Sequence, residues 1–183
     1  MSRQIGPWRV LDSREIYCNK WLRVREDQVV GPDGQKGTYS VIEFPPAVGI
    51  VALSGDEQIC LVGQHPYAVD TYSWEIPAGG AEPGEELLDA AKRELREEAG
   101  LAARSWDSLG WTHPINGVSD AIYHIYLARD LEQREREPDH TEDLSIKHIP
   151  LKDALRKCQN GEISDVYTVV AVFRAWNYLR RIE

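Results

Sequence analysis

Residues 79–101 read Gly-Gly-Ala-Glu-Pro-Gly-Glu-Glu-Leu-Leu-Asp-Ala-Ala-Lys-Arg-Glu-Leu-Arg-Glu-Glu-Ala-Gly-Leu. This stretch predicts a glycine-rich turn followed by a helix, because Pro83 and Gly84 stand before the helical part and Gly100 stands where a C-terminal cap glycine belongs. The apolar stripe of that helix is expected at Leu88, Ala91, Leu95 and Ala99.

Three carboxylates of the stretch share one face of the predicted helix. Glu94, Glu97 and Glu98 are related by i, i+3 and i+4, so they fall within an arc of about 100°. Like charges at these spacings destabilise a helix by a few tenths of a kcal/mol each, and a divalent cation is the simplest compensation. Oxygen ligands without a nearby His or Cys favour magnesium or manganese over zinc. A solvated helix face is the alternative reading for such a charge run.

The whole stretch resembles the Nudix box, G-x5-E-x7-R-E-U-x-E-E-x-G-U, where U is a bulky aliphatic residue. Every fixed position is filled, by Gly79, Glu85, Arg93, Glu94, Leu95, Glu97, Glu98, Gly100 and Leu101. The resemblance implies an α/β protein with the Nudix fold, an α/β/α sandwich around a mixed sheet.

The resemblance also implies roles for residues of the box. Glu94 and Glu98 would be metal ligands together with the backbone carbonyl of Ala78, and Glu97 would be a third ligand or a supporting catalytic residue. Arg93 would orient these carboxylates by ion pairing, with Glu85 as a further partner. Outside such a box, an Arg93–Glu85 pair would be read as an ordinary helix salt bridge. The implied cofactor is Mg²⁺, with Mn²⁺ as the alternative.

A further acidic group is expected from the loop before the last strand. Glu142 fits that position best, as a general base or a metal ligand, and Asp139 and His140 are the other candidates. Without the resemblance, each of them would be read as a surface residue.

The chain is expected to form an N-terminal β appendage over residues 1–45 and a Nudix hydrolase domain over 46–183, with Pro45-Pro46 as a stiff boundary. In the appendage, strands are predicted at 8–11, 21–26 and 37–44, with a hairpin turn at 31–34. In the main domain, strands are predicted at 47–53, 59–63, 72–76, 121–127 and 145–149, helices at 151–159 and 165–181, and a loop at 129–143. The last helix has an expected apolar stripe at Val169, Val172, Phe173, Trp176 and Leu179.

Features outside the box resemble the branch that contains ADP-ribose pyrophosphatases and nucleoside diphosphate sugar hydrolases. These are the appendage, the lead-in Trp74–Gly79, the segment His113–Asp120 and Gly161–Asp165. In that branch the appendage exchanges between two subunits, which implies a homodimer. Two or three strands with one apolar face also need a partner surface to be stable.

The implied reaction is metal-dependent hydrolysis of a nucleoside diphosphate sugar, with ADP-ribose giving AMP and ribose 5-phosphate. Relatives usually carry an arginine where this chain has Pro66, and a proline has no N–H to donate. Which residue takes the place of that arginine, and which aromatic side chain stacks on the base, remain open. The sequence offers several candidate substrate-binding residues. They are Trp21, Arg23, His65 and Pro114, with Arg25 and Tyr17 as further alternatives.

Composition limits the other functions. No stretch of the 183 residues approaches the ~20 apolar residues of a membrane span, and the first residues have no signal-peptide core. A net charge of −9 argues against nucleic-acid and membrane partners. Three widely spaced cysteines predict buried thiols in a reducing compartment, hence a cytoplasmic protein. An acidic protein that handles an anionic substrate needs cations in its site, which agrees with a metal.

Two alternatives stay open. Another Nudix substrate, such as GDP-mannose or an oxidised nucleotide, would use the same box. A non-catalytic, ligand-sensing Nudix module would be a different class of protein. The intact box and the lack of a basic extension argue against the module.

Overall fold

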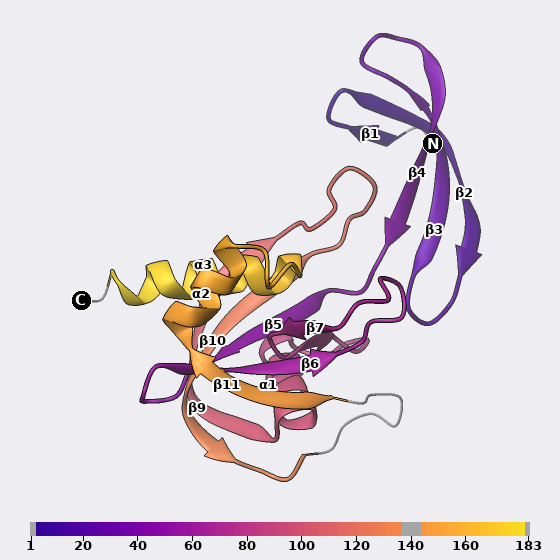
Figure 1. Cartoon of the computed structure of the whole chain (residues 1–183). Coiled ribbons are helices and arrows are strands. Elements are labelled where there is room, and N and C mark those ends of the chain that lie inside the picture. The colour runs from indigo at the N-terminus through magenta and orange to yellow at the C-terminus, as the bar shows by residue number, and fades with distance from the viewer. Residues whose placement is uncertain (1–2, 137–143, 182–183) are drawn as a thin grey trace. The chain divides into compact units, whose positions relative to one another are not determined.

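The computed structural model describes residues 3–136 and 144–181, and its internal contacts divide the chain into two compact units. The first unit holds the chain up to Pro45 together with residues 113–122, and the second holds 46–112 and the rest from Tyr123 (Figure 1). The segment 113–122, which the sequence assigned to the main domain, therefore packs with the appendage. The expected domains, an appendage over 1–45 and a Nudix hydrolase domain over 46–183, remain a prediction.

The first unit is a four-stranded antiparallel sheet with the order β1-β2-β3-β4. Its strands are β1 (Arg3–Ile5), β2 (Trp8–Cys18), β3 (Arg23–Val30) and β4 (Lys36–Glu43). The predicted turn at 31–34 joins β3 to β4, where Gly34 has a φ of 79° and donates its N–H to the carbonyl of Gly31 at 3.0 Å. Residues 113–122 attach to β4, because the Ile42 N–H donates to the carbonyl of Val118 at 2.8 Å.

The second strand is longer than the sequence indicated. It continues from the predicted 8–11 to Cys18 through a polar stretch. Cross-strand pairing explains this continuation, since Arg14 on β2 faces Glu26 on β3 and their side chains form an ion pair at 2.9 Å. Opposite charges on facing strand positions stabilise a solvated sheet face, and a pattern within one strand does not reveal them.

The described residues of the second unit form two sheets and three helices. One sheet has the order β8-β5-β10-β9 and is mixed, because β10 runs parallel to β5 while the other pairs are antiparallel; the second sheet has the order β11-β6-β7. The strands are β5 (Ala47–Ala52), β6 (Gln58–Gln64), β7 (Ser73–Glu75), β8 (Ala78–Gly80), β9 (Leu101–Thr112), β10 (Tyr123–Gln133) and β11 (Ser145–Pro150). The helices are α1 (Leu87–Ala99), α2 (Leu151–Gln159) and α3 (Val166–Leu179).

Alternation along β5 produces the two cores of this unit. Val48 and Ile50 belong to the cluster that contains Leu95 of α1, whereas Val51 belongs to the cluster that contains Ala171 of α3. Successive strand residues point to opposite faces, so β5 is buried on both sides. Figure 1 shows α1 on one side of the strands and α2 and α3 on the other. The predicted α/β/α sandwich around a mixed sheet is confirmed.

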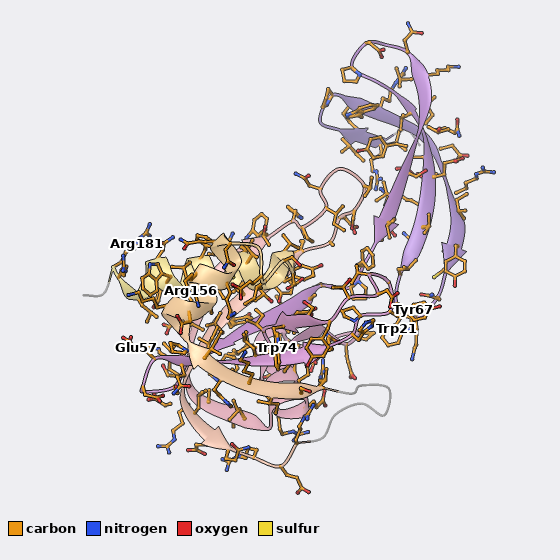
Figure 2. The ribbon with its side chains drawn as sticks, viewed as in Figure 1. Trp21, Glu57, Tyr67, Trp74, Arg156 and Arg181 are labelled. Atoms are coloured by element: carbon orange, nitrogen blue, oxygen red, sulfur yellow. The ribbon has the colours of Figure 1, made fainter. Side chains whose placement is uncertain are left out.

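The turn between β5 and β6 fixes where α2 begins. Glu57 lies in this turn with a φ of 60°, and its carbonyl accepts the N–H of Leu151, the first residue of α2, at 2.9 Å (Figure 2). The α2 helix has the predicted bounds, and Asn160 caps it with its backbone N–H donating to Arg156.

The sequence missed β9 and assigned the start of the predicted loop 129–143 wrongly. Residues 129–133 belong to β10 and pair with residues 101–105 of β9. Charged side chains are accommodated there by cross-strand ion pairs, such as Arg129 with Asp107 at 2.6 Å. Such pairs connect residues distant in sequence, so the charged run looked like a loop.

The buried face of α3 also differs from the predicted stripe. Thr168, Ala171, Val172 and Ala175 are the buried residues, and Phe173 is exposed. Thr168 explains part of the difference, because its hydroxyl accepts the N–H of Ile76 at 3.0 Å and donates to Asp165, the N-cap residue, at 2.7 Å. The hydrogen bond from Ile76 to Thr168 attaches α3 to the chain just before β8.

Two cysteines follow the prediction and one does not. Cys60 and Cys158 are buried, whereas Cys18 is exposed at the end of β2. Among residues 3–136 and 144–181, no helix is long and apolar enough to cross a membrane.

Candidate active site

The helix α1 has the predicted C-terminal cap. Gly100 adopts a left-handed conformation with φ of 62°, and its N–H donates to the carbonyl of Arg96 at 2.9 Å. Ala91, Leu95 and Ala99 are buried as predicted, while Leu88 is only half-buried. Burial of this stripe holds the acidic face of the helix beside the short strand β8.

Two glutamates of α1 lie against the backbone of β8. Glu98 is 5% exposed, and its Oε2 accepts the N–H of Ala78 at 2.9 Å. Glu94 is 9% exposed, and its carboxylate occupies the space beside Gly79. A Cβ at Gly79 would come within 2.1 Å of Oε1 and 2.2 Å of Cδ of Glu94. The glycine therefore leaves room for the carboxylate, a reason that the sequence pattern alone did not give.

Arg93 holds the acidic face from its exposed side. Its Nε and Nη2 donate to the two carboxylate oxygens of Glu85 at 3.0 Å each, and Nη1 donates to Glu94 at 2.7 Å and to Glu97 at 3.0 Å. Nη2 also donates to the carbonyl of Gly80 at 2.9 Å. The planar fork of arginine suits such multiple contacts, which a lysine cannot reproduce.

The charges around Arg93 act on one another. Hydrogen bonding to Arg93 lowers the pKa of Glu85. The same hydrogen bond is the largest cause that raises the pKa of Arg93, and the interactions with Glu94 and Glu97 raise it further. The guanidinium therefore offsets part of the repulsion between Glu94 and Glu97. Like-charge repulsion alone does not require a metal ion here, which corrects that step of the sequence argument. The case for a metal depends instead on the donor atoms.

The donor set fits a hard divalent cation. In the described part of the chain, no group of three or more His, Cys, Asp or Glu side chains is already gathered as a metal shell. Glu94 and Glu98 nevertheless bring buried carboxylate oxygens to the backbone at Ala78 and Gly79. Oxygen donors of this kind suit Mg²⁺ or Mn²⁺.

A thiol near Glu98 does not change this donor set. Cys60 is buried in the core against α1. Burial, followed by the negative charge of Glu98, raises the pKa of Cys60 to about 12. A thiol buried in apolar surroundings with a raised pKa is a packing residue of the core.

The segment around His65 is a surface turn. His65 Nε2 lies 3.7 Å from Asp70 Oδ1, and the carbonyl of Pro66 accepts the N–H of Asp70 at 3.1 Å. Tyr67 is fully exposed (Figure 2). The role of His65 in substrate binding stays a prediction.

Three substrate-binding candidates belong to the first unit. Trp21 is 63% exposed, and Lys20 Nζ lies 4.1 Å from the centroid of a Trp21 ring. Stacking on a ligand would require an accessible ring surface of this kind. Arg23 is bonded to Glu43, and Pro114 is half-buried in the segment 113–122. Their predicted roles stay untested.

The two alternatives in that unit have local partners. Arg25 donates to Asp27 at 3.1 Å and forms a second ion pair with Glu43, and the hydroxyl of Tyr17 accepts from Asn19 at 3.2 Å. The loop candidates Glu142, Asp139 and His140 lie outside the described residues.

Glu75 is a half-buried acid that the sequence argument did not single out. It lies on β7, and its Oε2 accepts from the side-chain amide of Gln64 at 3.0 Å. Burial, with the charge of Asp165 as the second cause, raises the pKa of Glu75. A glutamate between Trp74 and Ile76 was the available signal.

The buried carboxylates of α1 that meet the backbone of β8, inside an α/β/α sandwich, are the arrangement that the resemblance to the Nudix box implies. Residues 43–169 match the NUDIX domain, and residues 8–42 match the nucleoside diphosphate sugar hydrolase N-terminal domain. The chain therefore belongs to the Nudix family, and it is a Nudix-type pyrophosphatase. Members of this family generally use divalent metal ions.

Relatives match over nearly the full length. The chain is 29% identical over 166 residues to "ADP-ribose pyrophosphatase" of Bacillus subtilis, covering 90% of each sequence. It is 33% identical over 168 residues to "ADP-ribose pyrophosphatase" of Mycobacterium tuberculosis, covering 90% of this chain and 81% of the relative. A crystal structure of "ADP compounds hydrolase" superposes with a TM-score of 0.85 at 22% identity, covering 98% of this chain and 97% of that one. The similarity to this crystal structure shows that the two chains share a fold.

Proposed function

We propose that this protein uses Mg²⁺ or Mn²⁺ to hydrolyse the diphosphate bond of a nucleoside diphosphate sugar, with ADP-ribose giving AMP and ribose 5-phosphate. The observation that carries the proposal is the pair Glu94 and Glu98, two buried carboxylates held against the backbone of Ala78 and Gly79. The names of the Bacillus and Mycobacterium relatives support ADP-ribose as the substrate.

The chemistry requires a neutralised diphosphate and an aligned water. A bound divalent metal supplies charge neutralisation and acidifies a water. Glu94 and Glu98 would hold this ion together with the Ala78 carbonyl. Arg93 keeps Glu94 and Glu97 in place through the hydrogen bonds from its Nη1. Glu97 is the most exposed of the three and is assigned a supporting role or a third ligand position.

The general base is proposed to be Glu142, by resemblance and by its place in an acidic segment. Carboxylates occupied by metal are poor bases, so a proton acceptor is needed elsewhere. Glu142→Gln should lower kcat strongly with little change in KM. Asp139→Asn and His140→Ala are matched tests of its neighbours, and a crippled neighbour beside a near-normal Glu142→Gln would contradict the assignment.

A second substrate is favoured by one observation. Pro66 stands where relatives usually carry an arginine, and its carbonyl closes a turn with Asp70. A backbone without a donor there weakens recognition of ADP-ribose in particular, so GDP-mannose is the second candidate.

The protein is further proposed to act as a cytoplasmic homodimer held by residues 1–45. Its support is the number of large apolar side chains exposed on the first unit, including Ile5, Ile16, Tyr17 and Trp21. Exposed apolar side chains gathered in this way are typical of protein–protein contact surfaces. Sedimentation should give a dimer at micromolar concentration, and a stable, fully active monomer would contradict the proposal.

The substrate is tested by phosphate release with Mg²⁺, coupled to a phosphatase that acts on the products but not on intact diphosphates. ADP-ribose, GDP-mannose, other nucleoside diphosphate sugars and an oxidised nucleoside triphosphate form the panel. The proposal expects the highest kcat/KM for ADP-ribose. A clear preference for the oxidised nucleotide would overturn it.

A further inference from the structure

A second site is suggested by a pocket on the other side of Arg93, between α1 and β9. It has a volume of about 420 Å³. Its lining residues are Lys92, Arg93, Arg96, Ala102, Ala103, Trp106 and Arg134. Four of these are cationic and none is acidic, although the chain as a whole carries a net charge of −9. Carboxylates contact three of these cations from outside the pocket: Asp89 pairs with Lys92, Glu132 with Arg134, and Glu85, Glu94 and Glu97 with Arg93. An anionic ligand would therefore have to replace a carboxylate partner.

Two of the pocket cations, Lys92 and Arg134, form exposed ion pairs that a bound anion could displace. Lys92 forms an ion pair with Asp89 at 2.8 Å, and Arg134 with Glu132 at 2.5 Å. The two cationic side chains are 50% and 52% exposed. Exposed pairs of this kind contribute little to stability and rearrange easily. A phosphate, with its higher charge and several acceptor oxygens, would compete well with a single carboxylate.

The aromatic wall of the pocket has the form of a stacking surface. Trp106 is half-buried, and its indole Nε1 donates to the carbonyl of Ala103 at 3.1 Å. The ring lies edge-on to Tyr126, with centroids 6.3 Å apart. Its one hydrogen-bond donor is satisfied, so a ligand at this wall would meet the apolar part of the indole, on which a planar base can stack.

We propose that this cationic pocket binds a nucleoside 5′-phosphate, with the phosphate at Arg134, Lys92 and Arg96 and the base on Trp106. The site is separate from the carboxylates of the acidic face but shares Arg93 with them, since the guanidinium of Arg93 also bonds Glu94 and Glu97. The inference does not depend on which substrate the enzyme hydrolyses.

The test measures binding by calorimetry to the full chain in EDTA, where metal-dependent binding is absent. AMP, ribose 5-phosphate and inorganic phosphate are the probes. AMP should bind saturably and more tightly than the other two. Arg134→Ala should weaken AMP binding by at least about tenfold, as expected for one lost charge-assisted contact. Trp106→Leu should bring AMP close to ribose 5-phosphate while leaving the phosphate affinity unchanged.

Arg104→Ala is the matched control, because Arg104 forms an ion pair with the same Glu132 but does not line the pocket. It should leave AMP binding within about twofold of the wild type. Arg134→Gln serves as a second variant if Arg134→Ala unfolds, with thermal unfolding as the check. Three results would each overturn the proposal: no saturable AMP binding in EDTA, AMP binding insensitive to Arg134 and Trp106 variants, or an equal loss in Arg104→Ala. Equal affinities for AMP and inorganic phosphate would refute the stacked base.

Discussion

The two faces of α1 treat charge in opposite ways. On one face, Glu94 and Glu98 are buried against β8, and their positions are fixed by Ala78, Gly79 and Arg93. On the other face, Lys92 is half-exposed and paired with Asp89 across one turn of the helix. A buried charge must have defined partners, whereas an exposed one is solvated whichever partner it has. Substitutions should therefore be costly on the first face and mild on the second.

The largest effect is expected from Glu98→Gln. The change keeps the shape of the side chain and removes its charge, so the proposed metal ligand is lost while the bond from Ala78 is retained. We expect kcat to fall by ~10²–10⁴, the range for a positioned catalytic group. The readout is steady-state phosphate release in Mg²⁺. Glu86→Gln, an exposed residue directly before α1, is the control and should keep normal turnover. A normal kcat in Glu98→Gln would break the comparison.

The next effect separates two adjacent glycines. In Gly79→Ala the new methyl would come 2.1 Å from Glu94 Oε1, whereas in Gly80→Ala it would meet nothing within 4 Å. Displacing a catalytic carboxylate by about 1 Å costs roughly a hundredfold in rate. Gly79→Ala should therefore lose about two orders of magnitude in kcat/KM, and Gly80→Ala should stay within a few-fold of the wild type. Equal activities of the two variants would show that the contact with Glu94 is unimportant.

A smaller effect concerns Glu75, a half-buried acid that accepts a hydrogen bond from the side-chain amide of Gln64. Burial raises the pKa of Glu75, so its ionised form disfavours folding. This penalty is absent below the unfolded-state pKa of about 4.3 and develops as the pH rises through the higher folded-state value. Glu75→Gln should raise Tm by a few degrees at pH 8 and leave it near the wild-type value at pH 4. A lower Tm at pH 8 would contradict the assignment.

The smallest effect is expected on the exposed face of α1. Lys92→Ala removes the ion pair with Asp89, and we expect the free energy of unfolding to change by less than about 0.5 kcal/mol. Urea denaturation at low salt measures this change. A loss above about 1 kcal/mol would mean that the two faces of the helix are not as different as their burial suggests.

Local patterns predicted α1 well. Spacing placed three glutamates on one face, and Gly100 marked the end of the helix, where its φ of 62° confirms the cap. These features depend on residues within a few turns of one another, which periodicity reports directly. The α/β/α layering was implied by the resemblance to the Nudix family.

Long-range pairing was the part that the sequence did not reveal. The strand β9 and the end of β10 hold charged residues that pair across strands, as Arg129 does with Asp107, so the pattern of either segment alone resembled a loop. The same applies in the site, where Arg93 bonds to Glu85, Glu94, Glu97 and the carbonyl of Gly80 at once. Sequence spacing indicated an ion pair there and did not show that it offsets the repulsion first attributed to a metal.

Metal add-back tests the central claim, that catalysis requires a divalent ion held by Glu94 and Glu98. Wild-type protein stripped with EDTA is titrated with Mg²⁺ and then with Mn²⁺, and phosphate release from ADP-ribose is followed beside Glu94→Gln and Glu98→Gln. The wild type should be inactive without metal and recover fully, while each variant should recover about 1% or less of that turnover. Turnover without metal, or near wild-type recovery in both variants, would contradict the account.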